Sequence, residues 1–212
     1  MIRRHASFRA VTVALALMGL IILATAVYRA ATASFTHDEA LSYNDYMDLG
    51  YGEILSHTHA FTNNHLLNTL GMKLCKQLFG PTELALRLPN LLALVLFLYY
   101  AARLLRRLPP WLAVGGFVVL GTNSYMLEFF TLARGYGLSF GFALMALFHL
   151  IRAVQEMRTR DVLLFHAASV LATLSNFTLL NVHAAGLLVL YALVLARVSR
   201  GEVQRKRLVP FY

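Results

Sequence analysis

Long apolar stretches separated by short polar connections dominate the chain. Stretches of about 18 or more apolar residues are typical of helices that cross a bilayer, because hydrocarbon offers no partners for unpaired backbone groups. The short alternating strands of a transmembrane barrel are not visible. The pattern therefore predicts an all-α integral membrane protein with about six transmembrane helices. The expected spans are residues 11–31, 82–100, 111–127, 136–151, 162–174 and 182–196.

We expect a single transmembrane module over residues 1–212, with one long connection at residues 32–81. Within that connection, residues 66–79 predict an amphipathic helix. One face would carry Leu66, Leu67, Leu70, Leu74 and Leu78, and the opposite face Thr69, Lys73, Lys76 and Gln77. Such a helix lies flat in the headgroup layer or packs its leucine face on the rest of the protein, and the pattern leaves both open.

Composition and charge support the membrane prediction. The chain is 58% hydrophobic and only 14% charged, which is too little charge to cover the surface of a soluble domain. Its net charge of +9 would by itself suggest nucleic acid as a partner. The basic residues instead cluster at the ends of the predicted spans, so we expect no nucleic-acid partner. The single cysteine, Cys75, excludes an internal disulfide.

The basic clusters also predict the topology, because cytoplasmic loops of membrane proteins are rich in Lys and Arg. The N-terminus, residues 103–107, residues 152–160 and the C-terminal tail are all basic, and they alternate with the other connections. We therefore expect a cytoplasmic N-terminus and an outer segment 32–81, which holds half of the acids, in a cell (inner or plasma) membrane. The first apolar run, of about 20 residues, exceeds the apolar core of a signal peptide and is expected to be retained.

The end of the chain resembles the approach to another span. Residues 208–212 read Leu-Val-Pro-Phe-Tyr after the last basic cluster. We therefore expect the natural chain to continue beyond Tyr212.

Asp38 and Glu39 directly follow the first predicted span. Thr36 and Glu39 have the spacing of a capping box, and acids in a first helical turn suit the helix dipole. That structural role explains Glu39 without any chemistry. The alternative is that Asp38 is a general base or a metal ligand at the membrane surface, with its carboxylate aimed by the start of a helix.

Three histidines lie in the outer segment: His57, His59 and His65. His-x-His spacing occurs in zinc sites, but two loop histidines without a third ligand more often lie on the surface. Asn63 and Asn64 precede His65 immediately before the leucine-rich helix. This polar group is expected at the depth of a lipid headgroup.

Glu128 and Arg134 lie in the outer connection between the third and fourth predicted spans. An acid beside a long apolar run is costly unless it is paired or near water, so Glu128 is a candidate for function. The simpler interpretation is that Glu128 ends the span and pairs with Arg134. Arg134 is equally suited to hold a phosphate by charge-assisted hydrogen bonds.

Two other patterns have plain structural explanations. Glu83 and Arg87 are four residues apart, and we favour an ion pair along one helix slightly over phosphate binding by Arg87. Gly137 and Gly141 form a Gly-x-x-x-Gly motif, which favours close packing of helices.

In their order, these motifs resemble the N-terminal half of the GT-C glycosyltransferases. The nearest likeness is to the branch of dolichyl-phosphate-mannose–protein mannosyltransferases and the bacterial aminoarabinose–lipid A transferase. That family has an Asp-Glu pair after its first span, matched here by Asp38 and Glu39. His65 matches the histidine of a later His-Pro-Pro-Leu-like element whose prolines are missing here.

The likeness continues into the spans and covers about residues 11–200. Residues 83–89 resemble the family's Glu-x-x-x-Arg-x-Pro element. Residues 132–136 resemble its Glu-Ala-Arg-x-Tyr element, with Leu132 in place of the glutamate. The second acidic group of the family is thus absent from that position, and Glu128 is the substitute that the chain offers.

The resemblance implies transfer of a sugar from a polyprenyl-phosphate donor to a lipid, glycan or protein acceptor on the outer face, with inversion. On that basis Asp38 is the general base, and Glu39 assists it or binds metal. A divalent metal is used by some relatives and not by others, and Asp38 and Glu39 would be its ligands. The implied substrate-binding residues are His65, Arg87, Glu128, Arg134 and Tyr136.

Two other functions stay open from the sequence. A multi-pass transporter or lipid-handling permease would keep polar or broken helices near the bilayer midplane, and the predicted spans carry almost no charge there. A non-catalytic membrane subunit is the second alternative.

Overall fold

The computed structural model describes residues 2–56 and 64–200, with side chains from residue 9 onward. All regular elements in this part of the chain are helices, as predicted. They are α1 (Ile2–Thr32), α2 (His37–Tyr46), α3 (Tyr51–Leu55), α4 (Leu66–Phe79), α5 (Glu83–Leu105), α6 (Pro110–Thr122), α7 (Ser124–Phe130), α8 (Gly135–Glu156), α9 (Thr159–Ser175), a 3-10 turn η1 (Phe177–Leu179) and α10 (Leu180–Ser199).

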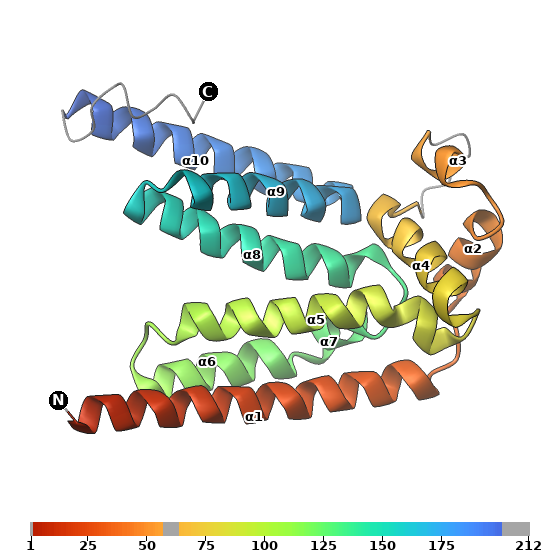
Figure 1. Ribbon diagram of the computed structural model, residues 1–212, viewed down its shortest axis with the longest axis horizontal. Coiled ribbons are helices and arrows are strands. Elements are labelled where there is room, and N and C mark those ends of the chain that lie inside the picture. Colours follow the sequence, from red (N-terminus) through yellow and green to blue (C-terminus); the bar gives the residue numbers. More distant parts are fainter. Residues whose placement is uncertain (1, 57–63, 201–212) are drawn as a thin grey trace.

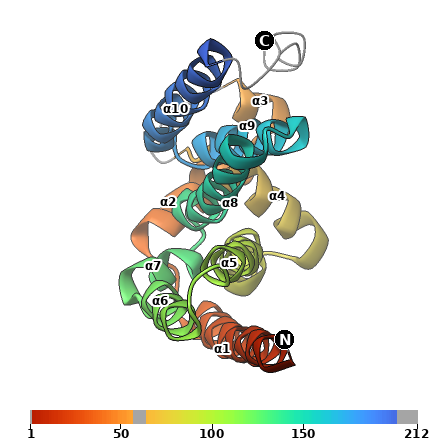
Figure 2. The same cartoon turned by 90° about the vertical axis from the view of Figure 1, so that its left-hand side faces the viewer.

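The long helices run roughly side by side, and the three short helices α2, α3 and α4 gather at one end of them (Figure 1). The end-on view shows α1 and α6 on one side, α5 and α8 in the middle, and α9 and α10 on the other side (Figure 2). The N-terminal end of α1, the α5–α6 connection and the α8–α9 connection lie together at the opposite end (Figure 1). The predicted basic connections and the acid-rich segment thus occupy opposite ends of the bundle.

The predicted number of spans is only partly reproduced. Four stretches are long and apolar enough to cross a membrane: Arg9–Thr32, Glu83–Leu105, Gly135–Glu156 and Phe177–Ser199. The predicted span 111–127 is broken into α6 and α7, which are bent by 60° and make a fifth span only if taken together. The bend lies at Asn123, whose side chain caps α7 by accepting a hydrogen bond from the Met126 amide at 3.1 Å.

The predicted span 162–174 corresponds to α9, which has 17 residues. At 1.5 Å per residue, its length is about 25 Å, against a hydrocarbon thickness of about 30 Å. By length and composition α9 is therefore not among the candidate spans. It still packs along α8 and α10, inside the bundle (Figure 1).

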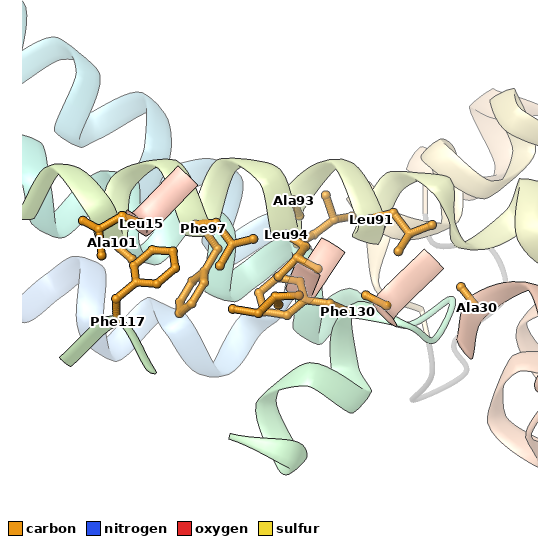
Figure 3. Close-up of a cluster of buried hydrophobic side chains, with 13 residues drawn as sticks. Leu15, Ala30, Leu91, Ala93, Leu94, Phe97, Ala101, Phe117 and Phe130 are labelled. Atoms are coloured by element: carbon orange, nitrogen blue, oxygen red, sulfur yellow. The ribbon is translucent and has the colours of Figure 1, made fainter. Parts of the chain in front are cut away.

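The main apolar core lies between α1, α5 and α6 and reaches to α7 (Figure 3). Leu15, Leu94, Phe117 and Phe130 are each at most 2% exposed within it. By contrast, only 17% of the most apolar window of α1 is buried, and the same holds for α10. Apolar outer faces of this kind suit helices surrounded by lipid.

Helices α5 and α8 approach each other closely along the Gly-x-x-x-Gly motif, as predicted. A Cβ atom added at Gly137 would lie 2.6 Å from Asn90 Oδ1 and 2.7 Å from the Phe129 carbonyl oxygen. One added at Gly141 would lie 2.8 Å from the Ala93 carbonyl oxygen. The two glycines therefore set the distance between these helices.

We expect Gly141→Ala to lower the free energy of unfolding by about 1–3 kcal/mol, because the added methyl group meets backbone that has no room to move. Chemical unfolding of the purified protein in detergent measures the change. Gly115→Ala is the matched control, since a Cβ at Gly115 meets nothing within 4 Å. Helix propensity favours alanine at both positions, so equal effects of the two substitutions would show that close packing at Gly141 contributes little.

Helix α4 spans the predicted residues, but two residues of its predicted polar face, Thr69 and Lys73, are buried. Asn68 and Met72 are buried, and the buried Lys73 Nζ donates a hydrogen bond to the Met47 carbonyl oxygen at 3.0 Å. Leu74 and Leu78 are 51% and 63% exposed. Leu66, Leu67 and Leu70 are half-buried, so the leucine face is partly packed at the start of α4 and exposed towards its end. This favours the interfacial alternative, in which the leucines enter the headgroup layer.

Candidate functional site

The polar centre of the molecule is a buried ion pair between Glu39 of α2 and Arg87 of α5. Arg87 Nε lies 2.8 Å from Glu39 Oε1, and Nη2 lies 2.9 Å from Oε2. Both side chains are fully buried. The remaining guanidinium hydrogens are donated to the carbonyl oxygens of Ala30, Ala33 and Ser34, at the end of α1. All N–H donors of the Arg87 side chain are thereby used, and Arg87 connects the end of α1 to α2 and α5.

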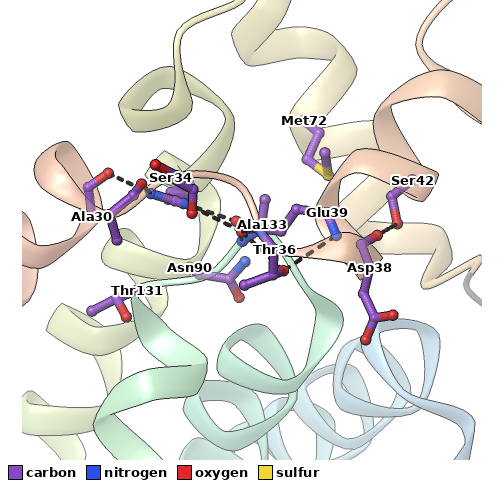
Figure 4. A network of polar contacts seen from close by, with 12 residues as sticks. Ala30, Ser34, Thr36, Asp38, Glu39, Ser42, Met72, Asn90, Thr131 and Ala133 are labelled. Atoms are coloured by element: carbon purple, nitrogen blue, oxygen red, sulfur yellow. Dashed lines mark hydrogen bonds and ion pairs between the residues drawn. The ribbon is translucent and has the colours of Figure 1, made fainter.

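Both carboxylate oxygens of Glu39 also accept hydrogen bonds from the protein backbone. Its Oε1 accepts the Ala133 amide at 2.6 Å, and its Oε2 accepts the Thr36 amide at 2.9 Å (Figure 4). The predicted capping box is present, because the Thr36 hydroxyl also accepts the Glu39 amide. Burial alone would raise the pKa of Glu39, but the hydrogen bonds from Arg87, Ala133 and Thr36 hold that pKa below its ordinary value.

Two buried asparagines extend this network towards α4 and α8. Asn90 Nδ2 donates to Asn68 Oδ1 at 2.8 Å, and Asn90 Oδ1 accepts the Leu138 amide at 2.8 Å. Asn68 Nδ2 donates to the Ala133 carbonyl oxygen at 2.9 Å. Both backbone groups of Ala133 are therefore held, and the connection that leads to Arg134 is fixed in place.

Asp38 and Arg134 meet on the outside of this network. Arg134 Nη1 lies 2.6 Å from Asp38 Oδ2, with the side chains 20% and 38% exposed. The Asp38 carboxylate points away from the contacts of Glu39 (Figure 4). Its other oxygen has no hydrogen-bond partner among the described residues. Neighbouring residues of one helical turn thus have separate roles, since Glu39 is buried in the fold and Asp38 faces a partly open surface.

His65 and Tyr136 complete the group. The two rings meet edge to face at 5.2 Å, and the Arg134 guanidinium lies 5.0 Å from the centre of the Tyr136 ring. Gly135 makes room for the histidine, because a Cβ there would lie 2.6 Å from His65 Cβ and would overlap the Ser175 carbonyl oxygen. Burial lowers the pKa of His65, and the nearby positive charge of Arg134 lowers it further.

We expect His65 to titrate below the ordinary histidine pKa of about 6.5 and to be neutral at pH 7. Arg134→Gln removes a repelling charge and should raise the pKa of His65, whereas Asp38→Asn removes an attracting charge and should lower it. Nuclear magnetic resonance titration of the His65 ring measures both shifts. Shifts of the same sign in the two variants would contradict the proposed arrangement of charges.

The structure thus brings together four of the predicted site residues: Asp38, His65, Arg134 and Tyr136. Glu128 lies exposed on α7, and no ion pair joins it to Arg134, so the predicted Glu128–Arg134 pair was wrong.

The predicted role of Arg87 is also corrected. Its ion-pair partner is Glu39, 48 residues away, and not Glu83, four residues away. With its guanidinium buried and saturated, Arg87 has no donor left for a phosphate.

A divalent metal does not fit the Asp38–Glu39 pair as it is arranged here. Both oxygens of Glu39 are occupied by protein donors, which leaves Asp38 alone with an open carboxylate oxygen. No group of three or more His, Cys, Asp or Glu side chains suited to a metal occurs among residues 9–56 and 64–200. His57 and His59, the predicted His-x-His pair, lie outside the described residues.

A sequence model of the dolichyl-phosphate-mannose–protein mannosyltransferase family matches residues 66–207. The chain belongs to this family. No curated protein and no solved structure matches the chain. Membership of this mannosyltransferase family, together with the apolar helices, makes the chain a multi-pass membrane protein of the GT-C glycosyltransferase type.

The family match includes Arg87, Arg134 and Tyr136 but begins after Asp38 and His65. The case for Asp38 and His65 therefore depends on their contacts with the matched segment. Two residues of the network, Asn68 and Asn90, were missed by the sequence analysis. Asn90 had a usable signal, because a buried amide within a long apolar helix needs partners.

Proposed function

We propose that this protein transfers a sugar from a polyprenyl-phosphate donor to an acceptor hydroxyl on the outer face of the membrane, with inversion at the anomeric carbon. The observation that carries this proposal is the contact between Asp38 and Arg134. A partly exposed carboxylate and a partly exposed guanidinium lie 2.6 Å apart beside His65 and Tyr136. A base for the acceptor and a cation for the donor phosphate are thereby held side by side.

In the proposed reaction the acceptor oxygen attacks the anomeric carbon while the bond from that carbon to the phosphate oxygen breaks. The acceptor proton passes to the free oxygen of Asp38. The polyprenyl phosphate leaves with the bonding electron pair, and Arg134 stabilises its charge by charge-assisted hydrogen bonds. Attack from the side opposite the leaving group inverts the configuration.

The surrounding residues position these two groups. The capping box fixes the first turn of α2, which carries Asp38. The Glu39–Ala133 and Asn68–Ala133 hydrogen bonds fix the connection that carries Arg134. Tyr136 holds the guanidinium by a cation–π contact. Precise positioning of this kind matters because small displacements of reacting groups greatly reduce rates.

The proposed location of the site follows from the same geometry. Helices α2 to α4 and the start of α8 lie at the end of the bundle opposite the basic connections (Figure 1), and α2 and the N-cap of α8 carry Asp38 and Arg134. If the basic end is cytoplasmic, as the positive-inside rule indicates, the site opens to the outer face. The exposed leucines of α4 would then lie at the depth of the donor's phosphate.

The proposal is tested with membranes that carry the full reading frame. Polyprenyl phosphates bearing different radiolabelled sugars are supplied, beginning with mannose, the sugar in the family's description. We expect covalent transfer of label to an endogenous acceptor, and a product whose anomeric configuration is opposite to that of the donor. Movement of the labelled lipid across the membrane without covalent transfer would instead support the permease alternative.

A further inference from the structure

An apolar groove with a cavity volume of about 420 Å³ lies between α1, α5 and α6. Leu20 and Leu23 of α1 and Val95 and Leu98 of α5 are among the side chains that line it. One end of the groove reaches Arg103 and Arg106 in the last turn of α5 and at its C-cap. This end of α5 lies beside the start of α1, at the opposite end of the bundle from α2, the helix that carries Asp38 (Figure 1).

A second cavity adjoins the groove at the same two arginines. It has a volume of about 160 Å³ and is lined by Arg103, Arg106, Arg107 and Phe148. Because both cavities are lined by Arg103 and Arg106, the apolar groove leads into a basic chamber. The groove and the chamber together therefore form an apolar cavity with several arginines at one end.

Arg103 is held at the junction by two aromatic side chains. Its Nη1 donates a hydrogen bond to the Tyr99 hydroxyl at 3.0 Å, and Tyr99 itself lines the groove. Its guanidinium also lies 4.6 Å from the centre of the Phe148 ring. These contacts orient Arg103, and neither of them is an ion pair.

The carboxylates at this end of the bundle are used by other arginines. Asp161 pairs with Arg152, and Glu156 pairs with Arg152 and Arg158. Within residues 9–56 and 64–200, neither Arg103 nor Arg107 forms an ion pair. The hydrogen bond of Arg107 goes to Gln155, which is neutral. The charges of Arg103 and Arg107 are therefore not neutralised by an ion pair in this part of the chain, and they can attract an anion.

We propose that this groove and chamber form a binding site for one anionic phospholipid, separate from the transferase site. An acyl chain would lie in the groove, and the phosphate would contact Arg103 and Arg106. Guanidinium groups bind phosphate through paired, charge-assisted hydrogen bonds, and apolar side chains suit an acyl chain. The positive-inside rule explains an excess of arginines at this end, but it does not explain an apolar groove that ends on two of them.

Native mass spectrometry of the full chain in detergent tests this proposal. The protein is mixed with equal amounts of phosphatidylglycerol and phosphatidylcholine that have identical acyl chains. We expect one phosphatidylglycerol to be retained with a preference of about tenfold, which corresponds to about 1.4 kcal/mol. Equal retention of the two lipids would overturn the proposal.

Two variants test the two parts of the site separately. Arg103→Gln with Arg106→Gln should abolish the headgroup preference. Ala16→Phe places a ring in the groove from the exposed Ala16 position without changing any charge, and it should reduce retention of both lipids. Unchanged retention in the Ala16→Phe variant would show that the groove is not occupied.

The matched control removes the same charge elsewhere at this end of the bundle. Arg197→Gln with Arg200→Gln changes two arginines at the end of α10 that line neither the groove nor the chamber. The preference for phosphatidylglycerol should survive in this variant. An equal loss of preference in both double variants would mean that the lipid responds to general charge and not to a site. Thermal unfolding of each variant verifies that the fold is retained.

Discussion

Asp38→Asn is expected to reduce the rate of sugar transfer by about 10²–10⁴-fold, the contribution typical of a positioned general base. The asparagine keeps the size of the side chain and can still accept a hydrogen bond from Arg134. It cannot take the proton of the acceptor hydroxyl. The loss should therefore appear in kcat, whereas KM for the lipid donor should change much less. Transfer assays on membranes with matched protein levels measure both constants.

Asp45→Asn is the matched control for this experiment. Asp45 lies on the same helix as Asp38, forms no ion pair with a described residue and loses the same charge on substitution. Its rate should remain close to that of the wild type. A near-normal rate for Asp38→Asn, with normal insertion in the membrane, would remove Asp38 as the base. In that case the Asp38–Arg134 pair would have only a structural role.

The gathering of Asp38, His65, Arg134 and Tyr136 could be predicted from the sequence, although only through resemblance. Nothing local in the chain indicates that residues 38 and 134 are in contact. The topology does support it, because both positions were assigned to connections on the outer side. The resemblance supplied the specific residues, and the structure brings them within contact distance.

The contacts of Glu39 and Arg87 could be predicted only in part. The capping box was visible in the sequence because it is a local pattern, and it is present. The Arg87 partner was not visible, because local spacing favours Glu83, four residues away, while the actual partner is 48 residues away. Arg87 is also held by hydrogen bonds to backbone carbonyl oxygens at the end of α1, and sequence patterns do not reveal the positions of these oxygens.

The predicted number of spans is reproduced only in part, for a related reason. Mean hydropathy along residues 111–127 is high enough to predict one continuous span. A single side chain, Asn123, nevertheless ends α6 and begins α7 by capping. The short polar sequence Thr122-Asn123-Ser124 was the available signal. A cap of this kind allows the helix to break within an apolar stretch, because it supplies a partner for a backbone amide that would be costly to leave unpaired in a membrane protein.

Arg87→Met is expected to lower the free energy of unfolding by about 3–5 kcal/mol, the cost of leaving one member of a buried ion pair without its partner. Glu39 would keep its charge in a fully buried position with only the Ala133 and Thr36 hydrogen bonds. The carbonyl oxygens of Ala30, Ala33 and Ser34 would lose their donor as well. Unfolding in detergent, followed by circular dichroism, measures the loss.

The double variant Glu39→Gln with Arg87→Met separates charge from packing. It should be more stable than Arg87→Met alone, because no unpaired charge stays buried and the glutamine oxygen can still accept the Ala133 amide. Glu83→Gln, a change in an exposed acid at the start of α5, is the control and should have little effect. If the double variant is no more stable than Arg87→Met, the unpaired charge is not the main cause of the lost stability. The main cause is then the loss of the Arg87 contacts with the end of α1.

The pH dependence of stability provides an independent measure of the same ion pair. The pKa of Glu39 is lower in the folded protein than in the unfolded chain, so the stabilisation is complete above the ordinary carboxyl pKa. It is lost as the pH falls through the folded pKa, because protonation removes the charge that Arg87 binds. The wild type should therefore lose stability in this acid range more steeply than Glu39→Gln, which cannot titrate at this position. Parallel pH profiles for the two proteins would show that the Glu39–Arg87 contact contributes little through charge, and that hydrogen bonding to the backbone alone holds α1, α2 and α5 together.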